Sequence, residues 1–143
     1  MQRSLNLLLG LALARQDQLG AAQAAIAGLT APSNAGGAWY FDLACVQARV
    51  GQTADALTTL SRSFEQTSPS QLEAARARAR VCADLAALRT AAGFDNALAT
   101  ESKIAESACS TGESCGKCPS RATCASAKAD GDKHGAAAKE VGK

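Results

Sequence analysis

The cysteines are the residues of this chain whose type and spacing could do chemistry. Four of the six follow the order Cys109-x5-Cys115-x2-Cys118-x5-Cys124 near the C-terminal end. Two thiolates two residues apart, with a glycine between them, can bend around one tetrahedral metal ion, and the two outer thiolates can complete a four-sulfur shell. These cysteines therefore predict a metal site, with zinc as the first candidate cofactor.

Other interpretations of the same four cysteines stay open. In an oxidising compartment they would form disulfides, for which four cysteines allow three connectivities. Cys115 and Cys118 have the spacing of a thioredoxin-like redox pair, and the Cys-x5-Cys-x2-Cys order resembles the cluster loop of some ferredoxins, but the strand-rich context of those folds is missing. If the cysteines bind a metal, His134 would be a substitute ligand. The last interpretation is a disordered tail without a site, in which His134 is simply solvated.

The two remaining cysteines, Cys45 and Cys82, lie inside helical apolar segments, where buried and inert thiols are expected. The chain has one histidine, no glycine-rich phosphate loop and no pair of acids whose spacing indicates a shared site. We therefore predict that the protein is not an enzyme.

Composition divides the chain at about residue 100. After Leu98 the only aliphatic residues larger than alanine are Ile104 and Val141, and no aromatic residue follows, so residues 101–143 are predicted to form a flexible, cysteine-containing tail. Residues 1–100 are rich in Ala, Leu, Gln and Arg, which favour helix, and predict an all-α domain. The formal net charge of +2 is spread evenly along the chain, so no nucleic-acid partner is expected.

The helical part repeats itself at an offset of 34 residues. Small, apolar and basic residues recur together in the pairs Leu9/Leu43, Gly10/Ala44, Ala12/Val46, Arg15/Arg49, Ala22/Ala56 and Ile26/Leu60. The small residues of these pairs are expected where two helices approach closely, because a larger side chain there would cost about 1–3 kcal/mol by overpacking.

Each repeat has two helical stripes of apolar residues around a polar turn, which predicts an antiparallel hairpin. In the second repeat Gly51 is expected to end one helix in the left-handed conformation, and Thr53 to cap the next. The predicted units are residues 3–34, 37–68 and a degenerate unit at 70–99, whose helices are expected at about 70–83 and 84–99. Ser70 and Glu73 form a capping-box pattern at its start.

Over about 95 residues the chain resembles the tetratricopeptide repeat, whose pattern is W-x2-L-G-x2-Y, then A-x3-F, then P. The second unit reads Tyr40-x2-Leu43-Ala44-x2-Gln47 and Ala56-x3-Leu60, and the first reads Asn6-x2-Leu9-Gly10-x2-Leu13 and Ala22-x3-Ile26. Gln47 and Ser63 depart from the pattern, at positions where an aromatic residue and an alanine are usual. The segment from Asp84 to Arg89, followed by Phe94, resembles the degenerate end of small bacterial arrays.

The resemblance implies helical hairpins stacked as a short right-handed solenoid, and a protein-protein interaction scaffold that holds a peptide or helix in a concave groove. The first helix of each unit would line the groove through Leu7, Leu11, Arg15, Phe41, Cys45 and Arg49. A small metal-binding protein that uses the cysteine-rich tail is the alternative function. Two clear units and a degenerate one make a marginal array, so either self-association or a fragment of a longer array is expected.

Residues 1–14 can be interpreted in two ways. The run from Leu5 to Ala14 has the apolar character and the Ala-x-Ala ending of a short secretory signal, which would make the protein exported or periplasmic. It is too short to span a bilayer. The repeat favours a buried first helix instead, and with it a cytoplasmic protein.

Overall fold

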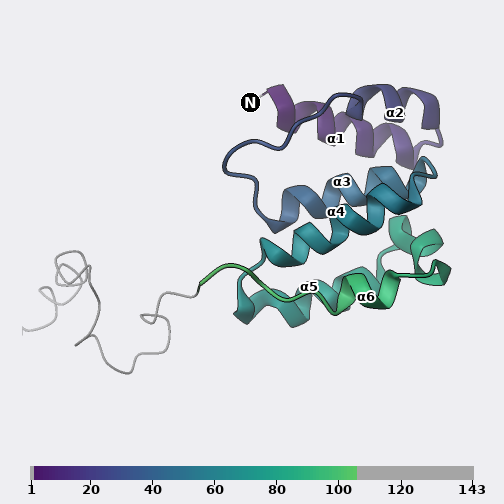
Figure 1. Cartoon of the computed structure of the whole chain (residues 1–143). Helices are drawn as coiled ribbons and strands as arrows, with labels where there is room; N and C mark the ends of the chain where they lie inside the picture. The colour runs from purple at the N-terminus through teal and green to yellow at the C-terminus, as the bar shows by residue number, and fades with distance from the viewer. Residues whose placement is uncertain (1, 106–143) are drawn as a thin grey trace, which may run out of the picture. The chain divides into compact units, whose positions relative to one another are not determined.

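A computed structural model describes residues 2–105 of the chain. The chain divides into two units, Met1–Glu106 and Ser107–Lys143, and the second lies outside the described residues. Within residues 2–105 the protein is all-helical, with six α-helices, one 3₁₀-helix and no strand, as the sequence predicts. Three pairs of segments, α1 with α2, α3 with α4, and α5 with α6, lie in successive layers (Figure 1).

The first hairpin joins α1 (Gln2–Arg15) and α2 (Leu19–Ile26) through a turn in which Asp17 has a positive φ of 58°. The two helices cross closely at Gly10. A Cβ added there would lie 2.9 Å from Cγ2 of Ile26 on the other helix, so any larger residue would push the helices apart. The close approach predicted for this small residue is therefore confirmed.

The second hairpin joins α3 (Gly37–Arg49) and α4 (Thr53–Glu65). Gly51 has a φ of +82°, which confirms the predicted left-handed residue after the first helix. The prediction that Thr53 caps the second helix is wrong. The cap position is Gln52, whose side chain makes no capping hydrogen bond, so α4 begins at Thr53 without a side-chain cap.

The next helix, α5 (Pro69–Val81), begins with proline at its first position, where the missing N–H costs nothing. Ser68 is the residue that precedes it, and Ser70 already lies inside the helix. The predicted capping box of Ser70 and Glu73 is therefore wrong, because the residue at the cap position is Ser68, two residues before Ser70. Glu73 forms an ion pair with Arg76 one turn later instead.

The prediction of one helix over residues 84–99 is also wrong. The chain forms a 3₁₀-helix, η1 (Ala83–Thr90), and then a short α-helix, α6 (Phe94–Leu98), separated by Gly93 with a φ of +104°. Leu85 and Leu88 are both fully buried, and three residues is one turn of a 3₁₀-helix, so this tighter helix turns both leucines to the core.

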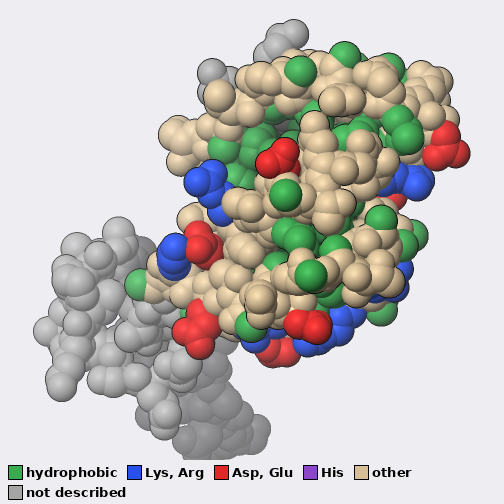
Figure 2. Space-filling model, turned by 45° about the vertical axis from the view of Figure 1, so that its right-hand side comes forward, with side chains coloured by type: hydrophobic (Ala, Val, Ile, Leu, Met, Phe, Trp, Pro, Cys, Tyr) green, Lys and Arg blue, Asp and Glu red, His purple; other side chains and the backbone are tan. Residues whose placement is uncertain are grey.

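The core runs through the middle of the molecule, and α3 packs against α1, α4 and η1. Its largest fully buried side chains come from several of these elements: Phe64, Leu60, Leu85, Leu88 and Val46. On α1 one side is buried, whereas Leu5, Leu8 and Leu9 are more than half exposed. Figure 2 shows hydrophobic side chains at the surface along the upper edge, at the height of α1 and α2. No helix within residues 2–105 is long and apolar enough to cross a membrane.

Candidate functional site

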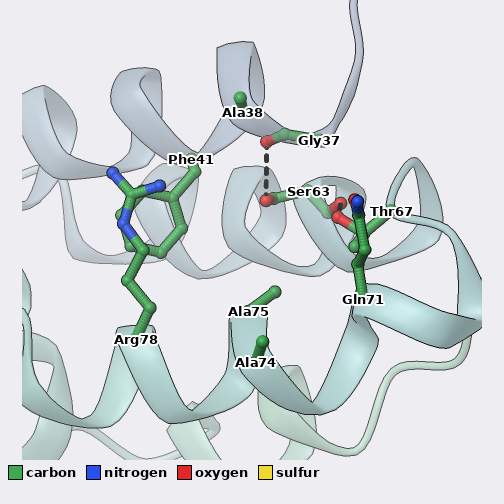
Figure 3. Close-up of a pocket in the computed structure, with 9 residues that line it drawn as sticks. All are labelled: Gly37, Ala38, Phe41, Ser63, Thr67, Gln71, Ala74, Ala75 and Arg78. Carbon is green, nitrogen blue, oxygen red and sulfur yellow. Dashed lines mark hydrogen bonds between the residues drawn. The ribbon is translucent and has the colours of Figure 1, made fainter.

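A cleft of about 380 Å³ opens between α3, α4 and α5. Small side chains from α3 and α5, among them Ala38 and Ala74, leave its space unfilled (Figure 3). The full lining consists of Gly37, Ala38, Phe41, Ser63, Thr67, Gln71, Ala74, Ala75 and Arg78. Its volume falls in the range of about 300–1,000 Å³ that small ligands and short peptide segments occupy.

One end of the cleft is a rigid polar wall where α3 meets α4. The Ser63 hydroxyl donates a hydrogen bond of 2.8 Å to the carbonyl oxygen of Gly37, and the Thr67 hydroxyl donates one of 2.7 Å to the carbonyl oxygen of Ser63. A Cβ on Gly37 would lie 2.7 Å from the Ser63 carbonyl oxygen, so only glycine permits this contact. Ser63, where the repeat pattern has alanine, thus has a defined structural role.

The opposite end carries the charge of the cleft. The Arg78 guanidinium lies 4.2 Å from the centre of the Phe41 ring, a cation-π contact, and its side chain is 60% exposed. Its ion pair with Asp42 is long, at 3.9 Å. Burial raises the pKa of the Asp42 carboxyl above its usual value, although the Arg78 charge acts in the opposite direction. Arg78 therefore retains hydrogen-bond donors that can bind an incoming carboxylate.

A second group of polar residues lies where α1, α3 and η1 meet. Arg15 donates two hydrogen bonds, of 3.0 Å from Nε and 2.8 Å from Nη2, to Oδ2 of Asp84. Nε of Arg49 lies 3.2 Å from Oδ1 of the same carboxylate, which is 8% exposed. The hydrogen bond to Asp84 raises the pKa of the Arg15 guanidinium. Two arginines that are 34 residues apart thus share one buried acid from η1.

Two free thiols lie beside this carboxylate. The sulfurs of Cys45 on α3 and Cys82 at the end of α5 are 3.9 Å apart. Cys45 is buried, as the sequence predicts, and burial together with the neighbouring Cys82 raises the pKa of its thiol, which makes the thiolate unfavourable. Cys82 is only partly buried, which corrects the expectation of a fully buried thiol.

The predicted groove residues are distributed over three environments. Leu7 and Leu11 are 2% and 8% exposed and belong to the core, so they do not line an open groove. Phe41 lines the cleft from a largely buried position. The other three, Arg15, Cys45 and Arg49, meet at the junction with η1, because η1 packs against α3 where the groove was expected. The tail cysteines Cys109, Cys115, Cys118 and Cys124 lie outside the described residues.

Of the nine residues that line the cleft, only Phe41 was predicted as a site residue from the sequence. The charged residues Arg78 and Asp84 were not assigned a role in either site. The recurrence of Arg15 and Arg49 at the repeat distance was the signal that could have indicated a shared acid.

No family model, curated protein or solved structure matches this chain.

Proposed function

We propose that the protein is a protein-interaction scaffold that holds a short peptide segment in the α3–α4–α5 cleft. The observation that carries the proposal is the cleft itself. It has an unfilled space of about 380 Å³, small side chains along its length and an exposed, weakly paired Arg78 at one end. The function proposed is binding rather than catalysis.

The proposal includes a tetratricopeptide-like arrangement of the hairpins. It is supported by the 34-residue recurrence and by the burial of the recurring small residues Ala22, Ala44 and Ala56, which are all 0% exposed. In such an arrangement the groove lies between the first helices of successive units, here α3 and α5. A cleft between α3 and α5 supports this arrangement, although η1 has no counterpart in the two preceding units.

The chemistry of the cleft defines the ligand. Ala38, Ala74 and Ala75 leave room for a small apolar side chain, whereas the guanidinium of Arg78 matches a carboxylate in charge and geometry. The fitting occupant is an extended peptide segment with a small apolar residue close to an aspartate, a glutamate or a C-terminal carboxylate. Arg78 would exchange its long contact with Asp42 for a shorter one with this ligand.

Selection from a random-peptide display library on the full chain tests the proposal. We expect the selected peptides to be enriched in acidic residues, and Arg78→Ala to weaken the best of them about tenfold, because hydrogen bonds to charged groups contribute about 1.5–3 kcal/mol. Ala74→Leu fills the cleft from an exposed position without removing charge and should also weaken binding. Arg62→Ala, at an exposed arginine of α4 outside the cleft, is the matched control.

Equal binding by the wild type, Arg78→Ala and Ala74→Leu would exclude the cleft as the binding site. Selected peptides with neither an acidic residue nor a free C-terminal carboxylate would exclude the role of Arg78.

The second proposed function is binding of zinc or another thiolate-ligated metal by the four tail cysteines. It rests on their spacing alone, which suits a tetrahedral thiolate shell. Metal analysis of the purified protein, with and without Cys115→Ser and Cys118→Ser, tests it. A metal content that is unchanged by these substitutions would remove the tail site.

The proposal also places the protein in the cytoplasm, with residues 1–14 retained as the first helix. Support comes from Leu7, Leu11 and Ala14, which bury one side of α1 in the core and would leave a cavity if α1 were removed. The exposed Leu5, Leu8 and Leu9 on the other side support self-association. An intact mass of the protein from its native host decides whether residues 1–14 are present, and its native mass reports the oligomeric state.

A further inference from the structure

Three metal-ligating side chains from two distant parts of the chain converge at the junction of α3, α5 and η1. One donor atom each from Cys45, Cys82 and Asp84 lies within 4.8 Å of the other two. Cys45 belongs to α3, Cys82 directly follows α5, and Asp84 is the second residue of η1. None of the three is used by the peptide-binding cleft.

The separation of the thiols fits a tetrahedral metal. Two sulfurs bound to zinc at about 2.3 Å, with a tetrahedral angle between them, lie about 3.8 Å apart. The sulfurs of Cys45 and Cys82 are 3.9 Å apart, so both can bind one ion with almost no movement. This spacing is much longer than the bond of about 2 Å that a disulfide requires.

The carboxylate of Asp84 has one oxygen that remains available to a metal. Oδ2 accepts both hydrogen bonds from Arg15, whereas Oδ1 has only the 3.2 Å ion-pair contact with Nε of Arg49. That Nε is buried and makes no hydrogen bond in the described part of the protein, so its contact with Oδ1 is poorly directed. Oδ1 of Asp84 can therefore bind a cation while Oδ2 keeps its two hydrogen bonds from Arg15.

The guanidiniums of Arg15 and Arg49 do not prevent a cation from binding, because binding leaves the net charge of the site unchanged. When a divalent cation binds, the thiols of Cys45 and Cys82 each release one proton to the solvent, and two metal–sulfur bonds and one metal–oxygen bond form. No electron is transferred. The two positive charges gained with the ion equal the two lost as protons.

We propose that Cys45, Cys82 and Asp84 bind one zinc-class divalent cation, with water as the fourth ligand. Cys82 is partly exposed, so the ion can enter from the solvent side and that side can hold the water. The bound ion would join α3 to the end of α5 and the start of η1. Three protein ligands and one open position are the arrangement of zinc sites that keep an exchangeable ligand.

The test must separate this site from the tail thiols, which would also bind zinc under the second proposed function. The starting protein is therefore the full chain in which Cys109, Cys115, Cys118 and Cys124 are replaced by serine. Purified under reducing conditions and loaded with zinc, it should retain about one zinc ion per chain after desalting. With cobalt in place of zinc it should show a sulfur-to-cobalt charge-transfer absorption.

In the same background, Cys82→Ser should remove the metal and the charge-transfer band. Because Cys82 is partly exposed, this variant is expected to fold, and an unchanged helical circular dichroism spectrum without metal confirms that it does. Asp84→Asn should bind zinc at least tenfold more weakly but keep the charge-transfer band, since both sulfurs remain.

Three results would overturn the proposal. The first is a tail-substituted protein that binds no zinc although both thiols are reduced. The second is full zinc retention by Cys82→Ser. The third is a loss of two daltons in the intact mass of the tail-substituted protein purified anaerobically without reductant, because it would show that the two sulfurs form a disulfide instead.

Discussion

Replacing Asp84 by asparagine tests the junction of α1, α3 and η1 most directly. The substitution keeps the shape of a side chain that is 8% exposed and removes its charge from between two guanidiniums. The hydrogen bonds from Arg15 connect residues 69 positions apart, so they hold the first helix to the third unit.

The expected loss in the free energy of unfolding can be worked out from the exposed fractions of the Arg15 and Arg49 side chains. A hydrogen bond between charged groups stabilises a protein by about 1.5–3 kcal/mol. Arg15 is 57% exposed, so solvent screens its share to about 0.5–1 kcal/mol. Arg49 is 31% exposed and has an ion-pair contact but no hydrogen bond to Asp84, so its larger share is the cost of leaving a less exposed charge beside a neutral partner. We expect Asp84→Asn to lower the free energy of unfolding by about 2–3 kcal/mol, or the Tm by about 10–20 °C in a domain of this size.

Thermal and urea unfolding of the full chain, followed by far-UV circular dichroism, measures the loss without added metal. Asp17→Asn is the matched control, because Asp17 is exposed and asparagine tolerates its positive φ equally well. A double-mutant cycle with Arg49→Gln should give a coupling energy of at least about 0.5 kcal/mol. If Asp84→Asn shifted the Tm no more than Asp17→Asn, the junction would contribute nothing to stability and the reasoning would be refuted.

Three further predictions concern packing and accessibility. Leu7→Ala should cost about 2–5 kcal/mol in urea unfolding, whereas Leu8→Ala, at a position 55% exposed on the same helix, should cost less than about 1 kcal/mol; equal losses would mean that α1 packs differently. Gly37→Ala should lower the Tm by several degrees, because its Cβ would collide with the Ser63 carbonyl, and an unchanged Tm would contradict that contact. Cys82 should react with iodoacetamide at pH 8 much faster than Cys45, whose thiol is buried and has a raised pKa, as peptide mass mapping can show; equal rates would contradict this burial.

The first two hairpins could be predicted because their determinants are local. Gly51 lies where α3 must end in the left-handed conformation, and Gly10 recurs as a small residue at the repeat distance from Ala44. Gly51 determines a turn of a few residues, and Gly10 contacts Ile26 within the same hairpin. Sequence pattern and helix propensity are therefore sufficient to place these helices. The start of α5 was misplaced, because proline at position 69 and serine at position 70 are both acceptable near the start of a helix.

The third unit could not be predicted because its conformation is decided by distant contacts. Leu85 and Leu88 are three residues apart, a spacing that suits an α-helix and a 3₁₀-helix equally well. The 3₁₀ form places both leucines in the core and Asp84 between Arg15 and Arg49, and neither arginine is near it in the sequence. For the same reason, no sequence pattern near Cys45 or Cys82 predicts that the two sulfurs lie close together.

The proposed metal site and the proposed peptide site share one structural element, α5. Cys82 follows its last residue, and Arg78 lies about one turn before it on the same helix. Zinc at Cys82 would fix the end of α5 against α3, and this is also the helix that carries one wall of the cleft. If zinc changes the affinity for a peptide, the peptide must change the affinity for zinc by the same factor. Equal peptide affinity with and without zinc would instead mean that the Arg78–Phe41 contact and the hydrogen bond from Arg89 to the Arg80 carbonyl already hold α5 in place.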